Sequence, residues 1–197
     1  MKFLKNIKEY RNVSNVDEVA RRYFVMNGFD GILTVLGIVM GVYAANLKNP
    51  EIIIVTVFSV CIANAISGFS GTFMSESAER IRQVKILERK MLKTFHNSII
   101  DESARFATLY CAMVASLSPF LLGLLNLTPM VLAYFNLVSY ITAFYLLIAI
   151  SLSILFFLGI FLGKVSRENI LFWGIKMFLV GLVTTAGLFL LGMAFNT

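Results

Sequence analysis

One carboxylate stands inside an otherwise apolar run of the sequence. Asp30 lies about one and a half helical turns past Phe24, where the run begins. A charged group inside a bilayer is costly unless it faces water, a cation or a protein partner, so it is a functional candidate by default. The plainer alternative is an ion pair with Arg21 or Arg22 at the membrane surface. Asp30 is the first residue to which we assign possible chemistry.

Small and polar residues share a helical face with this acid. Thr34, Gly37 and Gly41 follow Asp30 at i+4, i+7 and i+11, which form one stripe of a helix. The sequence holds two GxxxG pairs, which let helices approach closely: Gly37 with Gly41, and Gly159 with Gly163. We therefore expect the acidic face of the first run to be a packing face as well.

The second apolar run carries a similar stripe. It consists of Asn64, Gly68, Gly71 and Ser75, and the run ends in the acids Glu76 and Glu79. Three further residues near the acids could add ligands, namely Met26, Thr72 and Met74. Carboxylate oxygen, hydroxyl and thioether together suit a borderline divalent metal such as Fe²⁺ or Mn²⁺. Two plainer readings stay open: an i,i+4 pair between Glu76 and Arg80, and packing or lipid contact for the methionines.

The elements that must position these residues are long apolar segments. An apolar run of roughly 18 or more residues is long enough to span a bilayer as a helix. The sequence predicts an all-α, polytopic membrane protein with spans at about 24–46, 52–75, 106–125, 136–163 and 170–195. Residues 1–23 are expected to form a cytoplasmic or interfacial segment, and 24–197 a single membrane domain.

Two stretches need separate interpretation. The run 130–163 would reach roughly 50 Å as one helix, so we expect an interfacial lead-in before a tilted fourth span. An uncharged joint at 126–129 is expected to end the third span. The segment 76–105 is expected to be cytoplasmic and to contain an amphipathic helix, Arg80–Phe95, that continues the second span. Its basic side suits anionic lipid headgroups.

The basic residues indicate the orientation. The segments 1–23, 76–105 and 164–169 hold six, seven and two Lys or Arg residues, whereas the opposite side holds only Lys48. Basic residues favour the cytoplasmic side. The sequence therefore predicts a cytoplasmic N-terminus, an outside C-terminus and an odd number of spans, in the cell membrane.

Composition excludes several other classes of protein. The chain has 197 residues, 58% hydrophobic and 14% charged, with a net charge of +6 and a mean hydropathy of +0.82. The positive charge belongs to the membrane surface, so no nucleic-acid partner is expected. Cys61 and Cys111 are expected to be buried thiols, and His96 an exposed side chain. The motifs of metalloproteases, esterases and phosphate-binding loops are missing from the sequence, so we expect no enzyme and no resident cofactor.

The first two spans resemble those of the vacuolar iron transporter family. Arg22, Asp30, Gly31 and Gly41, in the stretch RYFVMNGFDGILTVLGIVMGV, match the pattern of that family's first span. The stretch ISGFSGTFMSESAERIRQ resembles its second span, in which Glu76 fits the terminal Glu. The last two spans share its glycine-rich pattern and short basic joint.

The resemblance implies a homodimer whose first helices line a path for divalent cations, driven by proton exchange. Asp30 would be the membrane ligand and Glu76 the acid at the cytoplasmic mouth, where Glu79 is a further candidate from the residues themselves. Two departures matter. Thr72 stands where the family usually has a Met, and the gap after the second span lacks the Glu-rich metal-binding insert of larger members.

Three functional hypotheses follow. The first is a divalent metal transporter for Fe²⁺ or Mn²⁺ that works as a homodimer by proton antiport. The second is a non-transporting membrane scaffold or regulatory subunit whose basic helix binds lipid or a partner. The third is a transporter of another substrate, such as Ca²⁺ or an organic cation. The tolerance of Asp30→Asn separates the first hypothesis from the second, because a scaffold gains from the loss of a costly charge.

Overall fold

The chain forms five long helices joined by short turns. The computed structural model describes residues 10, 16–47, 49–92 and 98–195. In chain order the helices are α2 (Val16–Ala44), α3 (Pro50–Met91), α4 (Ile99–Tyr134), α5 (Tyr140–Ser166) and α6 (Ile170–Phe195). All five are long and apolar enough to cross a membrane. The expectation of an all-α protein with five spans is confirmed.

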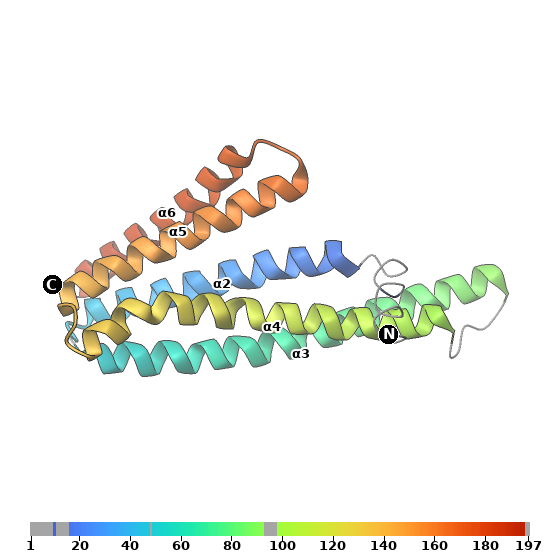
Figure 1. Cartoon of the computed structure of the whole chain (residues 1–197), viewed down its shortest axis with the longest axis horizontal. Coiled ribbons are helices and arrows are strands. Elements are labelled where there is room, and N and C mark those ends of the chain that lie inside the picture. The colour runs from blue at the N-terminus through green and yellow to red at the C-terminus, as the bar shows by residue number, and fades with distance from the viewer. Residues whose placement is uncertain (1–9, 11–15, 48, 93–97, 196–197) are drawn as a thin grey trace.

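Two layers of helices make up the molecule. α4 packs against α3, α2 and α5, while α5 and α6 form an antiparallel hairpin. Figure 1 shows this hairpin close to α2 and α4 at the end that holds the C-terminus and diverging from them toward its own turn. The largest buried cluster includes Val39, Val57, Met130 and Leu147, so it joins α2, α3, α4 and α5. These contacts fix α2 beside α3, which is what positions the residues discussed below.

The polar segment after the second span is two helix ends rather than one helix. α3 runs unbroken for 42 residues from Pro50 to Met91, so the expected continuation of the second span is confirmed as far as Met91. The part near Phe95 and His96 lies outside the described residues. From Ile99 onward the chain belongs to α4, so the segment 76–105 also contains the first turns of that helix. The paired ends of α3 and α4 extend beyond α2 (Figure 1).

The prediction that the third span ends at 126–129 is wrong. α4 continues to Tyr134 with Pro119 and Pro129 inside it. Pro129 has no N–H to bond the carbonyl of Leu125, four residues earlier, and the hydroxyl of Thr128 donates to that oxygen instead at 2.8 Å. Neighbouring hydroxyls of this kind allow proline inside membrane helices.

The remaining boundaries shift for related reasons. Residues 130–134 are the end of α4 and not a lead-in to the fourth span, which begins only at Tyr140 after its N-cap, Ser139. α2 begins at Val16, so the polar segment 1–23 includes the first two turns of this helix. The fifth helix, Ile170–Phe195, has the bounds that the sequence predicts. Cys61 and Cys111 are buried free thiols, as expected.

Candidate functional site: a polar cleft between α2 and α3

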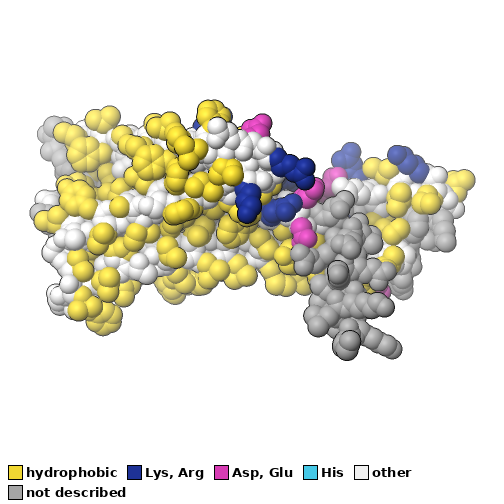
Figure 2. Space-filling model, turned by 45° about the horizontal axis from the view of Figure 1, so that its top comes forward, with side chains coloured by type: hydrophobic (Ala, Val, Ile, Leu, Met, Phe, Trp, Pro, Cys, Tyr) yellow, Lys and Arg dark blue, Asp and Glu magenta, His cyan; other side chains and the backbone are white. Residues whose placement is uncertain are grey.

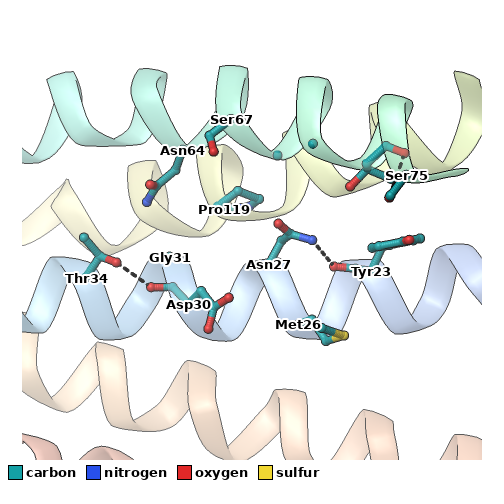
Figure 3. Close-up of a pocket in the computed structure, with 13 residues that line it drawn as sticks. Tyr23, Met26, Asn27, Asp30, Gly31, Thr34, Asn64, Ser67, Ser75 and Pro119 are labelled. Carbon is teal, nitrogen blue, oxygen red and sulfur yellow. Dashed lines mark hydrogen bonds between the residues drawn. The ribbon is translucent and has the colours of Figure 1, made fainter. Parts of the chain in front are cut away.

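A polar cleft of about 360 Å³ separates the middle parts of α2 and α3. Figure 3 shows Asn27 and Thr34 of α2 facing Asn64 and Ser67 of α3, with Pro119 of α4 between the two helices, whereas the Asp30 carboxylate is turned away from α3. The full lining is Tyr23, Met26, Asn27, Asp30, Gly31, Thr34, Asn64, Ser67, Gly68, Gly71, Thr72, Ser75 and Pro119. Most of these residues either carry an oxygen in the side chain or are glycines, which is unusual at the centre of apolar helices.

Glycines allow the cleft to form by bringing the three helices together. A Cβ at Gly31 would lie 2.8 Å from the Cβ of Pro119, and one at Gly68 would lie 2.9 Å from the carbonyl oxygen of Ala115. That carbonyl is the one that Pro119 cannot bond within the helix. A larger residue at either glycine would therefore push α2 or α3 away from α4 and open the base of the cleft.

Asp30 is the one acid among the described residues that line the cleft. It is an exposed residue, and it forms no ion pair with any other described residue. The alternative pairing with Arg21 or Arg22 is thus not found in the described part of the chain. Its backbone carbonyl accepts a hydrogen bond from the Thr34 hydroxyl at 2.7 Å, which leaves the carboxylate itself available to a ligand.

The other donors in the cleft are neutral. The side-chain amide of Asn27 donates to the Tyr23 carbonyl at 3.0 Å, and its side-chain oxygen faces Gly68 of α3. Thr72 is buried at 6% exposure, while the Met26 thioether is 54% exposed. Within the described ranges no group of three or more His, Cys, Asp or Glu side chains could hold a metal. One chain thus supplies a single charge and several neutral ligands.

Glu76 lies in a different environment at the end of the cleft. The Tyr23 hydroxyl donates to one of its carboxylate oxygens at 3.1 Å, and the Arg80 guanidinium bonds the other at 3.1 Å. Glu76 and Arg80 are 8% and 9% exposed, respectively. The i,i+4 pair that the sequence left open is therefore present. This network ties α2 to α3 next to Tyr23 and Ser75, the cleft residues at that end.

The structure brings together only part of the predicted metal path. Asp30, Met26 and Thr72 line the cleft, whereas Glu76, Glu79 and Met74 do not. Glu79 is on the surface and pairs with Arg82 at 3.4 Å, and Met74 is 70% exposed. The stripe predicted on the second span, by contrast, lies wholly in the lining: Asn64, Gly68, Gly71 and Ser75.

Some cleft residues were not singled out from the sequence. Asn27 and Tyr23 precede Asp30 by three and seven residues, so the helical period that selected Thr34 also places them near its face. Pro119 had no such signal, because its position depends on how α4 packs.

The two GxxxG pairs have different surroundings. A Cβ at Gly159 would lie 2.4 Å from the Trp173 carbonyl oxygen, and one at Gly163 would lie 2.8 Å from the Cα of Ile170. This pair therefore packs α5 on α6. A Cβ at Gly37 or Gly41 would meet nothing within 4 Å. The face of α2 beyond Asp30 is consequently open within one chain.

Comparison with known proteins gives this cleft a context. The model of the VIT family matches residues 21–110, which hold most of α2, all of α3 and the start of α4. An uncharacterised protein of the archaeon Methanocaldococcus jannaschii is 32% identical over 194 residues, covering 97% of both chains. No solved structure gives a significant match. The VIT family is one of membrane transporters of metal ions. From the family match over the cleft helices and the full-length relative, we conclude that the chain belongs to the VIT family, as its first two spans suggested.

Proposed function

We propose that this protein is a proton-coupled transporter of divalent metal ions, with Fe²⁺ or Mn²⁺ as its substrate, and that it works as a homodimer in the cell membrane. The observation that carries the proposal is Asp30, which is exposed in a polar cleft at membrane depth. It is fourteen residues from the end of α2 at Ala44, or about 21 Å along the helix. A carboxylate at that depth needs a cation, water or a partner to face.

A second copy of the chain would supply that partner. Met26 and Asp30 are exposed on α2, and a Cβ added at Gly37 or Gly41 further along it would meet nothing within 4 Å. Close approach of two α2 helices through this GxxxG pair would cover the open face. It would also bring two Asp30 carboxylates and two Met26 thioethers to one site. A divalent ion would then find two charges where a single chain offers one.

The ligand types support a borderline metal. Carboxylate, hydroxyl and amide oxygens with a thioether suit Fe²⁺ or Mn²⁺ better than a purely soft or purely hard ion. Ca²⁺ takes six to eight oxygen ligands and usually several carboxylates, whereas the proposed site between two chains would hold two Asp30 carboxylates together with two Met26 thioethers. The metal is the cargo here and not a resident cofactor.

The same carboxylate would couple the metal to protons. A metal ligand must be deprotonated, so binding releases a proton and protonation favours release of the metal. Exchange at Asp30 would thus link metal movement in one direction to proton movement in the other. Glu76 is held by Tyr23 and Arg80, and we propose that it acts at the cytoplasmic mouth when this network opens. Glu79, Thr72 and Met74 keep the secondary roles predicted for them.

Metal flux into proteoliposomes tests the proposal. Uptake of Fe²⁺, Mn²⁺, Co²⁺ and Ca²⁺ is compared with and without a pH gradient, for the wild type and for Asp30→Asn. The matched control is Glu51→Gln, which removes an exposed acid in the first turn of α3, away from the cleft.

We expect gradient-dependent uptake of Fe²⁺ or Mn²⁺ that Asp30→Asn abolishes and Glu51→Gln retains. An Asp30→Asn variant that is folded and fully active would refute the role of this residue. Absence of flux from a well-folded wild-type protein would favour the scaffold hypothesis instead.

A further inference from the structure

A second large cavity lies between the cytoplasmic parts of α3 and α4. It measures about 580 Å³, a size typical of sites that bind small molecules. We call it the α3–α4 groove. Its lining is Phe73, Ser77, Arg80, Ile81, Val84, Lys85, Glu88, Asp101, Ala104, Arg105, Thr108 and Leu109. None of these residues lines the cleft that holds Asp30.

The chemistry of the lining changes along the groove. α3 and α4 run antiparallel (Figure 1). Phe73 and Leu109 therefore lie at the end of the groove nearer the membrane, and Lys85 and Asp101 lie toward the end away from it. Phe73 and Leu109 are each 42% exposed, and Ile81 is 53% exposed. Charged side chains gather at the other end. On the face drawn in Figure 2, a broad apolar surface likewise gives way to Lys, Arg, Asp and Glu side chains toward the end of the molecule where α3 and α4 extend beyond α2.

We propose that the α3–α4 groove binds one anionic phospholipid from the adjacent leaflet. The acyl chains lie on Phe73, Ile81 and Leu109, and the phosphate lies against Lys85 and Arg105. This site is separate from the metal path and does not depend on the proposed transport.

The position of the groove beside the membrane favours a lipid over a soluble ligand. The apolar end of the groove belongs to helices that span the membrane, so the molecules beside it are lipids at high local concentration. Ligands at high concentration occupy a site even when each contact is weak. A phospholipid also matches the change from apolar to charged lining within a single molecule.

The positive charge around the groove favours a lipid with an anionic headgroup. The groove itself is lined by three basic residues and two acids, Glu88 and Asp101, and the described residues 80–92 and 98–105 hold six Lys or Arg residues against three Asp or Glu residues. Lys85 forms no ion pair with the described part of the chain. Arg105 bonds Asp101 at 3.2 Å with a side chain that is 74% exposed, so this pair is weak and its guanidinium can turn toward a phosphate. Arg80 is already held by Glu76 and serves as part of the wall.

Lipid binding by the full chain in detergent micelles tests this site. Native mass spectrometry measures the affinity for phosphatidylglycerol and for phosphatidylcholine with the same acyl chains. The test variant is Lys85→Gln, and its control is Arg89→Gln, an exposed basic residue of α3 outside the groove. Asp101→Asn removes the acid that competes for Arg105. Val84→Phe fills the apolar part without a change in charge.

We expect phosphatidylglycerol to bind more tightly than phosphatidylcholine, and Lys85→Gln to weaken it about fivefold while Arg89→Gln has little effect. Asp101→Asn should strengthen binding of the anionic lipid. Val84→Phe should weaken the binding of both lipids without lowering the melting temperature of the protein. Equal loss in Lys85→Gln and Arg89→Gln would overturn the site in favour of diffuse surface attraction. Competition by inorganic phosphate alone would overturn the choice of a lipid.

Discussion

The contact between α5 and α6 allows a sharp test of the packing. Gly159 lies where the two helices touch, and a Cβ added there would be 2.4 Å from the Trp173 carbonyl oxygen and 2.7 Å from the Cα of Gly174. Both neighbours are backbone atoms, so no side chain can turn aside. Gly159→Ala therefore requires the hairpin to separate by about an ångström, because ordinary contacts begin near 3.4 Å.

The size of the effect follows from two opposing contributions. Overpacking in a well-packed interior costs roughly 1–3 kcal/mol, whereas replacing Gly by Ala in a helix contributes up to about 1 kcal/mol of stability. Gly187 of α6 would meet nothing within 4 Å, so Gly187→Ala has the second contribution without the first. The difference between the two variants isolates the packing cost, and we expect Gly159→Ala to be less stable by about 1–3 kcal/mol.

Thermal unfolding in one detergent measures this difference. For a chain of this size, 1 kcal/mol corresponds to about 2–4 °C in melting temperature, so Gly159→Ala should melt several degrees below Gly187→Ala. Equal melting temperatures would show that α5 and α6 do not approach closely at Gly159. The GxxxG pair on α5 would then be free for another helix.

Three further predictions address the polar groups and the orientation. Arg80→Gln should lower the free energy of unfolding by roughly 3–5 kcal/mol, because it leaves the buried Glu76 carboxylate without its ion-pair partner. Arg82→Gln breaks the exposed pair with Glu79 and should cost about 1 kcal/mol or less. Equal melting temperatures of the two variants would contradict the buried network. Asn126 has a fully buried side-chain oxygen without a hydrogen-bond partner among the described residues, and its amide donates to the Ser151 hydroxyl at 2.6 Å. The double variant Asn126→Leu, Ser151→Ala removes both partners of that bond together with the unbonded oxygen, so its stability should stay within about 1 kcal/mol of the wild type or exceed it; a large loss in thermal unfolding would show that the oxygen has a partner. In intact cells, an impermeant thiol reagent should label Asn46→Cys, and Arg89→Cys only after the membrane is opened; the reverse pattern would invert the predicted orientation.

Much of the fold could be predicted because each span satisfies its own backbone. A helix in lipid bonds every backbone group within the segment, so the length and polarity of a run are enough to find it. The last helix has the predicted bounds for this reason. The error at the end of α4 has a local cause as well, since Thr128 supplies the bond that Pro129 cannot make.

The candidate site was likewise predictable in part from the sequence. The period of a helix placed Asp30 and Thr34 on one stripe, and Asn64, Gly68, Gly71 and Ser75 on another. All six line the cleft, whereas Gly37 and Gly41 of the first stripe do not. The period could not decide whether Glu76 joins them. Its burial beside Tyr23 depends on the angle at which α2 meets α3.

The sequence by itself determined the five spans, the two polar stripes and the family, because these depend on composition and spacing along one helix. Only the tertiary structure decided which stripes face each other, which acid is left without a partner and where glycines allow close contact. Those features depend on distances between helices. The Asp30 carboxylate has no ion-pair partner among the described residues, whereas the Glu76 carboxylate is held by Arg80 at 3.1 Å.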